Sequence, residues 1–242
     1  MNTTSPTSEG ALAGKVALVT GGSRGIGFAI ARVLTSHGAS AVISGRSSKD
    51  LEGAHAELGP RTLAVEADVR DPEDAERLVH DAVGHFGGLD VVVNNAGVGL
   101  FGNVEAMSVA DWHTIVETNL SGVFYCCRAA IPHLKERGGG WIINVSSLAG
   151  SNPFAGGAAY CASKAGLDAF SEALMQEVRH DDIRVSCVAP GSVATGFSRG
   201  AGSAADWKIQ PEDVAQVVLD LIRMPARSLP SRVELRPSRP RK

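Results

Sequence analysis

The sequence lacks the features that mark several specialised classes of protein. Its 242 residues contain no run of 18 apolar residues, so no segment is expected to span a membrane. Residues 1–10 are rich in serine and threonine without an apolar core, so no signal peptide is expected and the cytoplasm is the predicted location. The formal net charge is only −3, which leaves no basic excess for binding a nucleic acid.

Metal-binding and disulfide patterns are also missing. The seven histidines form no HxH, HxxxH or HExxH pattern, so we expect them on helix surfaces and predict no metal site. The cysteines show no CxxC spacing, which favours buried free thiols over a disulfide framework or a zinc site. There are four of them: Cys126, Cys127, Cys161 and Cys187.

What the sequence does contain is a regular alternation of short apolar runs and longer amphipathic ones. The apolar runs are typical of strands buried on both faces of a parallel sheet, and the alternation predicts an α/β, doubly wound sheet of about seven strands with helices on both faces. We expect one domain over residues 14–236, between a flexible tail at 1–13 and a basic tail at 237–242. The predicted strands are 15–20, 40–44, 62–66, 89–94, 141–145, 184–189 and 232–236, and the predicted helices are 25–37, 49–58, 72–86, 108–136, 157–180 and 211–223.

A glycine-rich motif connects the first predicted strand to the first helix. Gly21 permits a tight turn, Gly25 lets the backbone approach a pyrophosphate, and Gly27 lets the helix pack closely against the sheet. The N-terminus of the helix then offers free N–H groups to the phosphates. This context favours a Rossmann-like dinucleotide site over a merely flexible turn, with contacts expected from Gly21, Ser23, Arg24, Gly25, Ile26 and Gly27.

The end of the second predicted strand bears on the choice of dinucleotide. An acidic residue there would bind the ribose 2′-hydroxyl of NAD, but the strand is followed by Arg46 and Ser47. A guanidinium can instead bind a 2′-phosphate through two hydrogen bonds, and Arg24 offers a second cation. We therefore favour NADP(H) over NAD(H), the alternative being that both arginines are solvated surface groups.

Further motifs follow along the chain in a fixed order. Together with TGGSRGIG at residues 20–27, they make the sequence resemble the short-chain dehydrogenase/reductase family, in its shorter size class and similar to 3-oxoacyl-[acyl-carrier-protein] reductases. The resemblance runs from residue 15 to about residue 195 and implies an NAD(P)-dependent oxidoreductase acting on CH–OH and C=O groups. The motifs are Asp68-Val69, NNAG at 94–97, Asn119, Ser147, Tyr160-xxx-Lys164, and Pro190-Gly191 with Thr195.

Four of these residues make chemical sense as a catalytic set. Tyr160 and Lys164 are four positions apart and share a helix face, so the ammonium is expected to lower the phenol pKa from about 10 and suit it to proton transfer. Ser147 follows a strand and can donate to a carbonyl oxygen, whereas Ser146 is expected to point to the other side. By resemblance, Asn119 supports a water-linked proton relay to Lys164. Taken singly, Tyr160 could be a core residue and Lys164 a solvated one.

The resemblance also implies the remaining contacts to cofactor and substrate. Asp68 and Val69 would flank the adenine, and Lys164 would bind the nicotinamide ribose beside Tyr160. An apolar substrate pocket is expected under a partly open lid at residues 196–210. Asn95, Ala96 and Gly97 would close over the cofactor, Pro190, Gly191, Val193 and Thr195 would hold its nicotinamide end, and the pocket would include Leu148, Asn152, Phe154 and Phe197, with Val98, Leu100, Phe101 and Pro153 nearby.

The predicted function is an NADPH-dependent reductase of a ketone or 3-oxoacyl compound, with Tyr160 as general acid. One alternative is a dehydrogenase that oxidises a secondary alcohol, steroid or sugar, and another is a catalytically idle NADP-binding regulator. An acyl-carrier-protein partner is in doubt, because Gly138 and Asp181 stand where related reductases carry docking arginines. Apolar positions on the helices at 108–136 and 157–180 predict a homotetramer or dimer.

Overall fold

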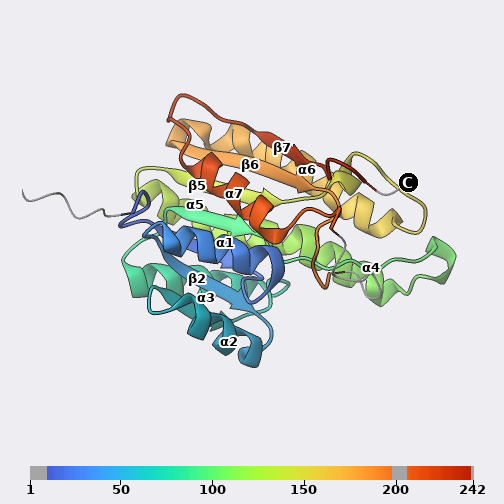
Figure 1. Ribbon diagram of the computed structural model, residues 1–242, viewed down its shortest axis with the longest axis horizontal. Coiled ribbons are helices and arrows are strands. Elements are labelled where there is room, and N and C mark those ends of the chain that lie inside the picture. Colours follow the sequence, from blue (N-terminus) through green and yellow to red (C-terminus); the bar gives the residue numbers. More distant parts are fainter. Residues whose placement is uncertain (1–9, 198–205, 241–242) are drawn as a thin grey trace, which may run out of the picture.

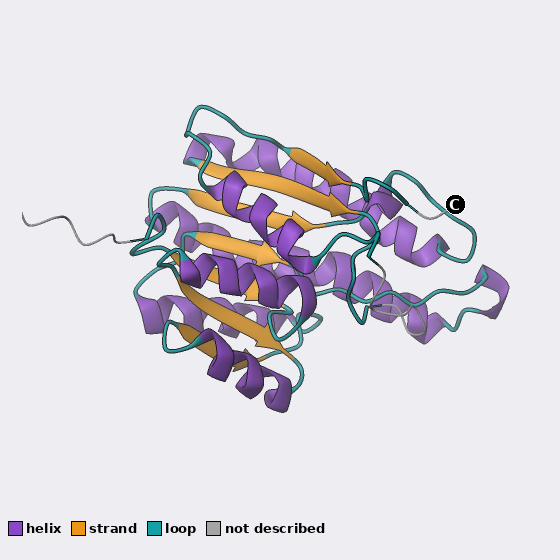
Figure 2. Cartoon of the chain, in the orientation of Figure 1, coloured by secondary structure: helices purple, strands orange, loops and turns teal. Residues whose placement is uncertain are grey.

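The computed structural model describes residues 10–197 and 206–240 of the chain. It contains one seven-stranded sheet in the order β3-β2-β1-β4-β5-β6-β7, and every neighbouring pair is parallel (Figures 1 and 2). The strands are β1 (Val16–Thr20), β2 (Ser40–Gly45), β3 (Thr62–Glu66), β4 (Val91–Asn94), β5 (Gly140–Val145), β6 (Ile183–Pro190) and β7 (Arg232–Leu235).

Helices cover both faces of this sheet, which confirms the predicted doubly wound, Rossmann-like architecture. One hydrophobic cluster joins the sheet to α1, α2 and α7, and a second joins its other face to α3, α5 and α6. The helices are α1 (Gly25–Ser36), α2 (Ser48–Leu58), α3 (Pro72–Phe86), α4 (Val109–Val116), α5 (Gly122–Glu136), α6 (Ala158–Val178) and α7 (Pro211–Ile222).

Local sequence signals account for many of the element boundaries. The Asp71 side chain accepts a hydrogen bond from Glu73 N at 2.9 Å, Pro72 occupies the first helical position, and Gly87 ends α3 with φ 79°. All five residues of β1 and all four of β4 are buried, as expected for strands that are apolar up to the polar residue at their carboxyl ends, Thr20 and Asn94. These central strands therefore form a rigid platform, and their carboxyl ends meet at one edge of the sheet.

Two predicted boundaries differ from the structure. The helix predicted over residues 108–136 is divided into α4 and α5 by a π-helical turn at Glu117–Ser121. The predicted tail at 1–13 is too long at its inner end, because Leu12 is buried in the core and its N–H donates to the His37 carbonyl. The outer part of that tail, residues 1–9, lies outside the described residues, as do residues 241–242 of the predicted basic tail.

The structure also describes the cysteines, the length and apolarity of the helices, and the groups of side chains that could bind a metal. All four cysteines are free and buried. Over residues 10–197 and 206–240, no helix combines the length and apolarity needed to cross a membrane. In the same ranges, no group of three histidine, cysteine or acidic side chains is placed to hold a metal ion.

Candidate active site

The four residues predicted to act in catalysis come together at the carboxyl edge of the sheet. Tyr160 and Lys164 lie on α6, Ser147 follows β5, and Asn119 lies in the π-helical turn. Ser147 lies close enough to Tyr160 for its hydroxyl to influence the phenol pKa, and Lys164 Nζ lies 6.0 Å from the centroid of the Tyr160 ring. A Cβ placed on Gly97 would lie 3.3 Å from Asn119 Oδ1 and 3.8 Å from Lys164 Nζ. Both side chains therefore lie next to Gly97.

The environment of Tyr160 keeps its phenol protonated. The residue is buried, and burial raises the pKa of the phenol above its usual value of 10, although the Ser147 hydroxyl acts in the opposite direction. The expectation that Lys164 lowers this pKa is wrong for this structure, because the ammonium points to a backbone carbonyl rather than to the phenol oxygen. A neutral phenol at pH 7 can donate a proton to a substrate oxygen.

Lys164 is held in place almost without solvent. Its side chain is buried, and Nζ donates to the Val145 carbonyl at 2.9 Å. Burial lowers the pKa of the ammonium from 10.5 to about 8, and the Asp168 carboxylate offsets part of that effect. The lysine is therefore poised to lose its charge just above neutral pH, which is uncommon outside functional sites.

Asn119 uses its whole side chain to position the loop that follows β4. Its Oδ1 accepts from Val98 N at 2.8 Å, and its Nδ2 donates to Val98 O at 3.0 Å and to Ser163 Oγ at 3.1 Å. Both Nδ2 hydrogens are therefore used within the protein, and the π-helical turn releases the Asn119 backbone from regular α-helical hydrogen bonding. Ser163, which lies between Tyr160 and Lys164 in the sequence, is a supporting residue that the motifs alone did not indicate.

The two adjacent serines contact different residues of the same helix, so the prediction that Ser146 points to the other side of the strand is wrong. Ser147 lies beside Tyr160 near the start of α6, whereas Ser146 is buried and donates to Asp168 Oδ1 at 2.5 Å, further along α6. Asp168 also accepts from Cys187 Sγ at 3.1 Å and from Arg232 Nη1 at 2.8 Å. Sequence reasoning missed this carboxylate, although its position four residues after Lys164 placed it on the same face of α6.

The glycine-rich turn leaves no room for side chains. Gly21 and Gly25 have φ values of 64° and 56°, and a Cβ on Gly27 would lie 2.3 Å from the Gly21 oxygen. Arg24 is the N-cap residue of α1 but makes no capping hydrogen bond, and the first turn of α1 contains no acidic residue. The N–H groups and the positive end of the helix dipole are therefore available to an anion such as a pyrophosphate.

The loop after β4 is fastened to this turn through Thr20. Its Oγ1 accepts from both Asn95 N and Ala96 N at 3.0 Å, and Asn95 Nδ2 donates to Thr20 O and Gly21 O. Thr195 approaches from the segment after β6, since a Cβ on Gly25 would lie 3.4 Å from its Cγ2. The structure thus brings residues from three predicted cofactor motifs to one place. The rest of the third motif runs from Pro190 at the end of β6 through Gly191 to Val193, which is paired with Ile209.

The side chains beyond the end of β2 are less closely organised. Arg46 is exposed, and Ser47 caps α2 by accepting a hydrogen bond from Asp50 N at 3.3 Å. Asp68 forms an ion pair with Arg70 at 2.5 Å, and that pairing lowers the pKa of its carboxyl group. Arg46 lies close enough to contribute to the same lowering, so a cation does border this part of the site. Val69 is buried next to Gly122 of α5.

Aromatic side chains gather on the side of Tyr160 that was predicted to meet the substrate. Phe101, Phe154 and Phe197 are all exposed and belong to the segments that follow β4, β5 and β6. Leu148 lies near Gly191, while the Asn152 amide is held by the Leu148 carbonyl at 3.1 Å and is exposed. Most of the predicted lid, residues 198–205, lies outside the described residues.

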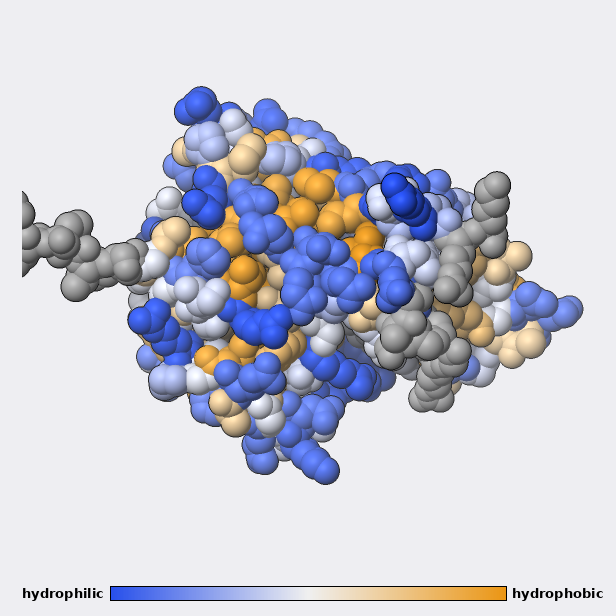
Figure 3. Space-filling view, in the orientation of Figure 1, coloured by the Kyte–Doolittle hydropathy of each residue, from blue (hydrophilic) through white to orange (hydrophobic). Residues whose placement is uncertain are grey.

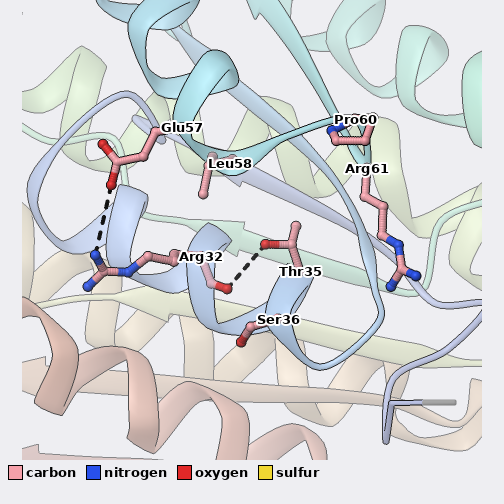
Figure 4. A pocket seen from close by; sticks show the side chains of 7 residues that line it. All are labelled: Arg32, Thr35, Ser36, Glu57, Leu58, Pro60 and Arg61. Carbon is pink, nitrogen blue, oxygen red and sulfur yellow. Dashed lines mark hydrogen bonds and ion pairs between the residues drawn. The ribbon is translucent and has the colours of Figure 1, made fainter. Parts of the chain in front are cut away.

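Two pockets in the described part of the chain lie away from the predicted catalytic residues. One, of about 310 Å³, is formed by α1, α2 and the turn before β3, and Figure 4 shows Arg32 paired with Glu57 at its rim. The other, of about 660 Å³, lies near the amino ends of β4, β5 and β6, at the edge of the sheet opposite Tyr160. Neither contains any of the residues predicted to act in catalysis.

Comparisons with known proteins agree with this arrangement. The family model for short chain dehydrogenase matches residues 15–206. An uncharacterized oxidoreductase of Staphylococcus epidermidis is 32% identical over 223 residues, which are 92% of this chain and 97% of that protein.

Solved structures extend the likeness to three dimensions. An alcohol dehydrogenase from the archaeon Thermococcus sibiricus, complexed with 5-hydroxy-NADP, is similar with a TM-score of 0.87 and 31% identity, covering 94% of this chain and 99% of that one. A 3-ketoacyl-(acyl-carrier-protein) reductase from Brucella melitensis, complexed with NADH, has a TM-score of 0.86 and 30% identity, covering 93% and 98%. The chain belongs to the short-chain dehydrogenase family and is an oxidoreductase.

Proposed function

We propose that the protein is an NADPH-dependent carbonyl reductase, with a ketone or 3-oxoacyl compound as substrate and Tyr160 as the proton donor. The observation that carries the proposal is the buried phenol of Tyr160, which lies beside Ser147 at the edge of the sheet where the glycine-rich turn lies and whose pKa is raised by burial. Reduction of a carbonyl needs a neutral acid beside the oxygen, and this phenol meets that need at neutral pH.

A nicotinamide dinucleotide fits the residues that surround this site. The uncapped N-terminus of α1 would hold the pyrophosphate, and the segment from Pro190 to Thr195 would hold the nicotinamide end. Arg46 and Arg24 are both exposed, and no acidic residue follows β2 directly, which supports NADP(H) over NAD(H). When bound, the cofactor supplies a hydride to the carbonyl carbon.

Residues of the chain would then stabilise and protonate the oxygen of the carbonyl group. Ser147 would donate a hydrogen bond to it and so stabilise the negative charge that develops, while Tyr160 would transfer its phenolic proton to the same atom. Lys164 would bind the nicotinamide ribose through its ammonium group. Asn119 would hold the loop after β4 in position and support the return of a proton to Lys164.

The main alternative is oxidation of a secondary alcohol by the same residues in reverse. Tyr160 would then need to act as a base, which its raised pKa disfavours at neutral pH. The two similar structures leave the substrate open, because one is an alcohol dehydrogenase and the other a 3-ketoacyl-(acyl-carrier-protein) reductase. A carrier-linked substrate is thus one member of the proposed class.

The test is to replace Tyr160 by phenylalanine and to measure turnover and cofactor binding separately. NADPH oxidation with a panel of ketones is expected to fall by roughly 10²–10⁴-fold in Tyr160→Phe, because the general acid is lost. NADPH titration by fluorescence is expected to change little, since the ring and the phosphate site remain. Tyr125→Phe, which alters the other tyrosine of the chain on α5, is the matched control. Retention of a tenth or more of turnover in Tyr160→Phe would contradict the proposal.

A further inference from the structure

Aromatic residues are scarce in this protein, yet several of them stand exposed at one place. The sequence has only seven phenylalanines and two tyrosines. Among the described residues, four phenylalanines are exposed to a similar degree: Phe101 by 47%, Phe124 by 46%, Phe154 by 49% and Phe197 by 42%. All but Phe124 lie around Tyr160, and we refer to Phe101, Phe154 and Phe197 as the aromatic cluster.

The cluster is assembled from segments that are distant in sequence. The ring centroid of Phe101 lies 5.5 Å from that of Tyr160 and 5.8 Å from that of Phe154, and the Phe197 centroid lies 5.9 Å from Tyr160. The ring planes meet at 50° to 74°, within the tilted and edge-to-face range that aromatic pairs prefer. Two separate loops therefore bring Phe101 and Phe197 against the proposed proton donor, and a third brings Phe154 against Phe101.

Two glycines make this arrangement possible. A Cβ on Gly99 would lie 2.5 Å from Phe197 Cε1 and 3.1 Å from Phe101 Cζ, and a Cβ on Gly157 would lie 2.5 Å from Phe154 Cε2. Real Cβ atoms do not approach other atoms so closely, so a side chain at either position would displace a ring. Glycine at both positions thus leaves the rings room to lie where they do.

Folding leaves much of this apolar surface in water. Burying an aromatic side chain is favourable, and half-exposed rings retain much of that free energy for a ligand. The three rings of the cluster carry no charge and no hydrogen-bond donor, so a carboxylate or phosphate on the substrate would gain nothing from them. A ligand ring would bury the exposed faces and gain edge-to-face contacts as well.

We infer that the aromatic cluster binds an aryl group of the substrate, so that the substrate is an uncharged ketone carrying an aromatic ring near its carbonyl group. The inference rests on the proposed function of Tyr160, because proximity to the proton donor is what makes the cluster part of the substrate site. Phe101 is the central member, since its ring contacts both Tyr160 and Phe154.

The experiment compares 4-phenylbutan-2-one with 4-cyclohexylbutan-2-one. In both ketones the ring is separated from the carbonyl group, so intrinsic reactivity is matched and only the aromatic character differs. We expect kcat/KM to be about tenfold higher for the phenyl compound, equal to about 1.4 kcal/mol. In Phe101→Leu the ratio of kcat/KM for the phenyl ketone to that for the cyclohexyl ketone is expected to fall below about threefold. Phe124 is an equally exposed phenylalanine on α5, and Phe124→Leu is expected to keep the wild-type ratio.

The outcomes separate this inference from the proposed function. Turnover of both ketones with equal kcat/KM, or a ratio that survives Phe101→Leu, would overturn the aryl site and leave the reductase intact. If no ketone is turned over, saturation-transfer NMR tests whether 4-phenylbutan-2-one still binds to the aromatic cluster. A signal that Phe101→Leu removes would uphold the aryl site while refuting the reductase, and no signal would refute both.

Discussion

Lys164 carries a positive charge where the fold gives it almost no solvent. Its folded-state pKa of about 8 lies below the 10.5 of an exposed lysine, so between these values the unfolded chain binds more protons than the folded one. The buried lysine therefore destabilises the wild-type protein by its full amount below pH 8. This destabilisation disappears as the pH rises towards 10.5. A group that destabilises the protein at neutral pH is retained, which fits a functional role.

This reasoning predicts a pH-dependent effect of Lys164→Met on stability. The free energy of unfolding of the variant minus that of the wild type is expected to be larger at pH 7 than at pH 10. The reason is that only the wild type becomes more stable over that range of pH. Urea unfolding at both pH values measures the difference. Lys49→Met, at an exposed position on α2, is the control. A relative stability that is the same at pH 7 and pH 10 would show that Lys164 is not shifted as the structure indicates.

A second residue-scale prediction concerns the choice between the two dinucleotides. Arg46→Asp is expected to reduce kcat/KM with NADPH and to raise it with NADH, because the carboxylate repels a 2′-phosphate and can accept from a 2′-hydroxyl. A well-placed charge pair is worth about 1–3 kcal/mol, so the ratio should change by roughly ten- to a hundredfold. Steady-state kinetics with both cofactors provide the measurement, and Arg61→Asp, an exposed arginine just before β3, is the comparison. Comparable values for both cofactors in the wild type would contradict the NADP(H) preference.

The sequence indicated the candidate catalytic residues better than how their surroundings tune them. Tyr160, Lys164 and Ser147 could be proposed because the family motifs contain them and because their spacing fits one helix face and the end of a strand. The direction of the Tyr160 pKa shift could not, since it depends on how deeply the phenol is buried and on where the Lys164 ammonium points. Both are properties of packing between elements far apart in the chain.

At the scale of elements, the Asp168 carboxylate joins four pieces of the fold. It lies on α6 and receives hydrogen bonds from Ser146 after β5, Cys187 on β6 and Arg232 on β7. Its side chain is only 13% exposed, so its partners would be poorly compensated by water if it were removed. The carboxylate thereby fixes the helix that carries Tyr160 and Lys164 against the sheet.

Asp168→Ala is therefore expected to destabilise the protein. Leaving buried donors unsatisfied costs about 1–3 kcal/mol, which lowers Tm by roughly 2–10 °C for a domain of this size. Glu172→Ala, one helical turn further along α6 and exposed, is the matched control and is expected to change Tm little. Differential scanning calorimetry of the two variants gives the answer, and equal Tm values would remove Asp168 from its proposed role.

Element boundaries were predictable where side chains signal them locally and not where tertiary contacts decide. α3 begins at Pro72 and ends at Phe86 as its cap residues predict. The π-helical turn that contains Asn119 left no trace in the apolar pattern of residues 108–136, because the extra residue per turn is stabilised by contacts with the loop at Val98 and with Ser163. The buried position of Leu12 likewise depends on a partner at His37.

At the scale of the whole molecule, two surfaces retain apolar character that one chain leaves uncovered. On the face in Figure 3, hydrophobic residues gather around α7 and β7, where Val217, Ile222, Met224 and Val233 are only partly buried. On the opposite layer, Phe124 of α5 is 46% exposed, and its ring lies 6.5 Å from that of Phe170 on α6. Patches of this kind are typical of subunit interfaces, and two of them allow a tetramer rather than only a dimer.

We therefore expect light scattering at micromolar concentration to give a mass of two or four times 25.1 kDa. Phe124→Arg is expected to lower that mass by at least half, because a two-fold axis would bring the introduced charge close to its own copy in an apolar contact. Glu172→Arg, an exposed charge reversal on α6, controls for a general effect of added positive charge. The secondary structure should be unchanged by circular dichroism in both variants, since neither side chain belongs to the core. A wild-type protein with the mass of a single chain would show that these apolar surfaces do not hold subunits together.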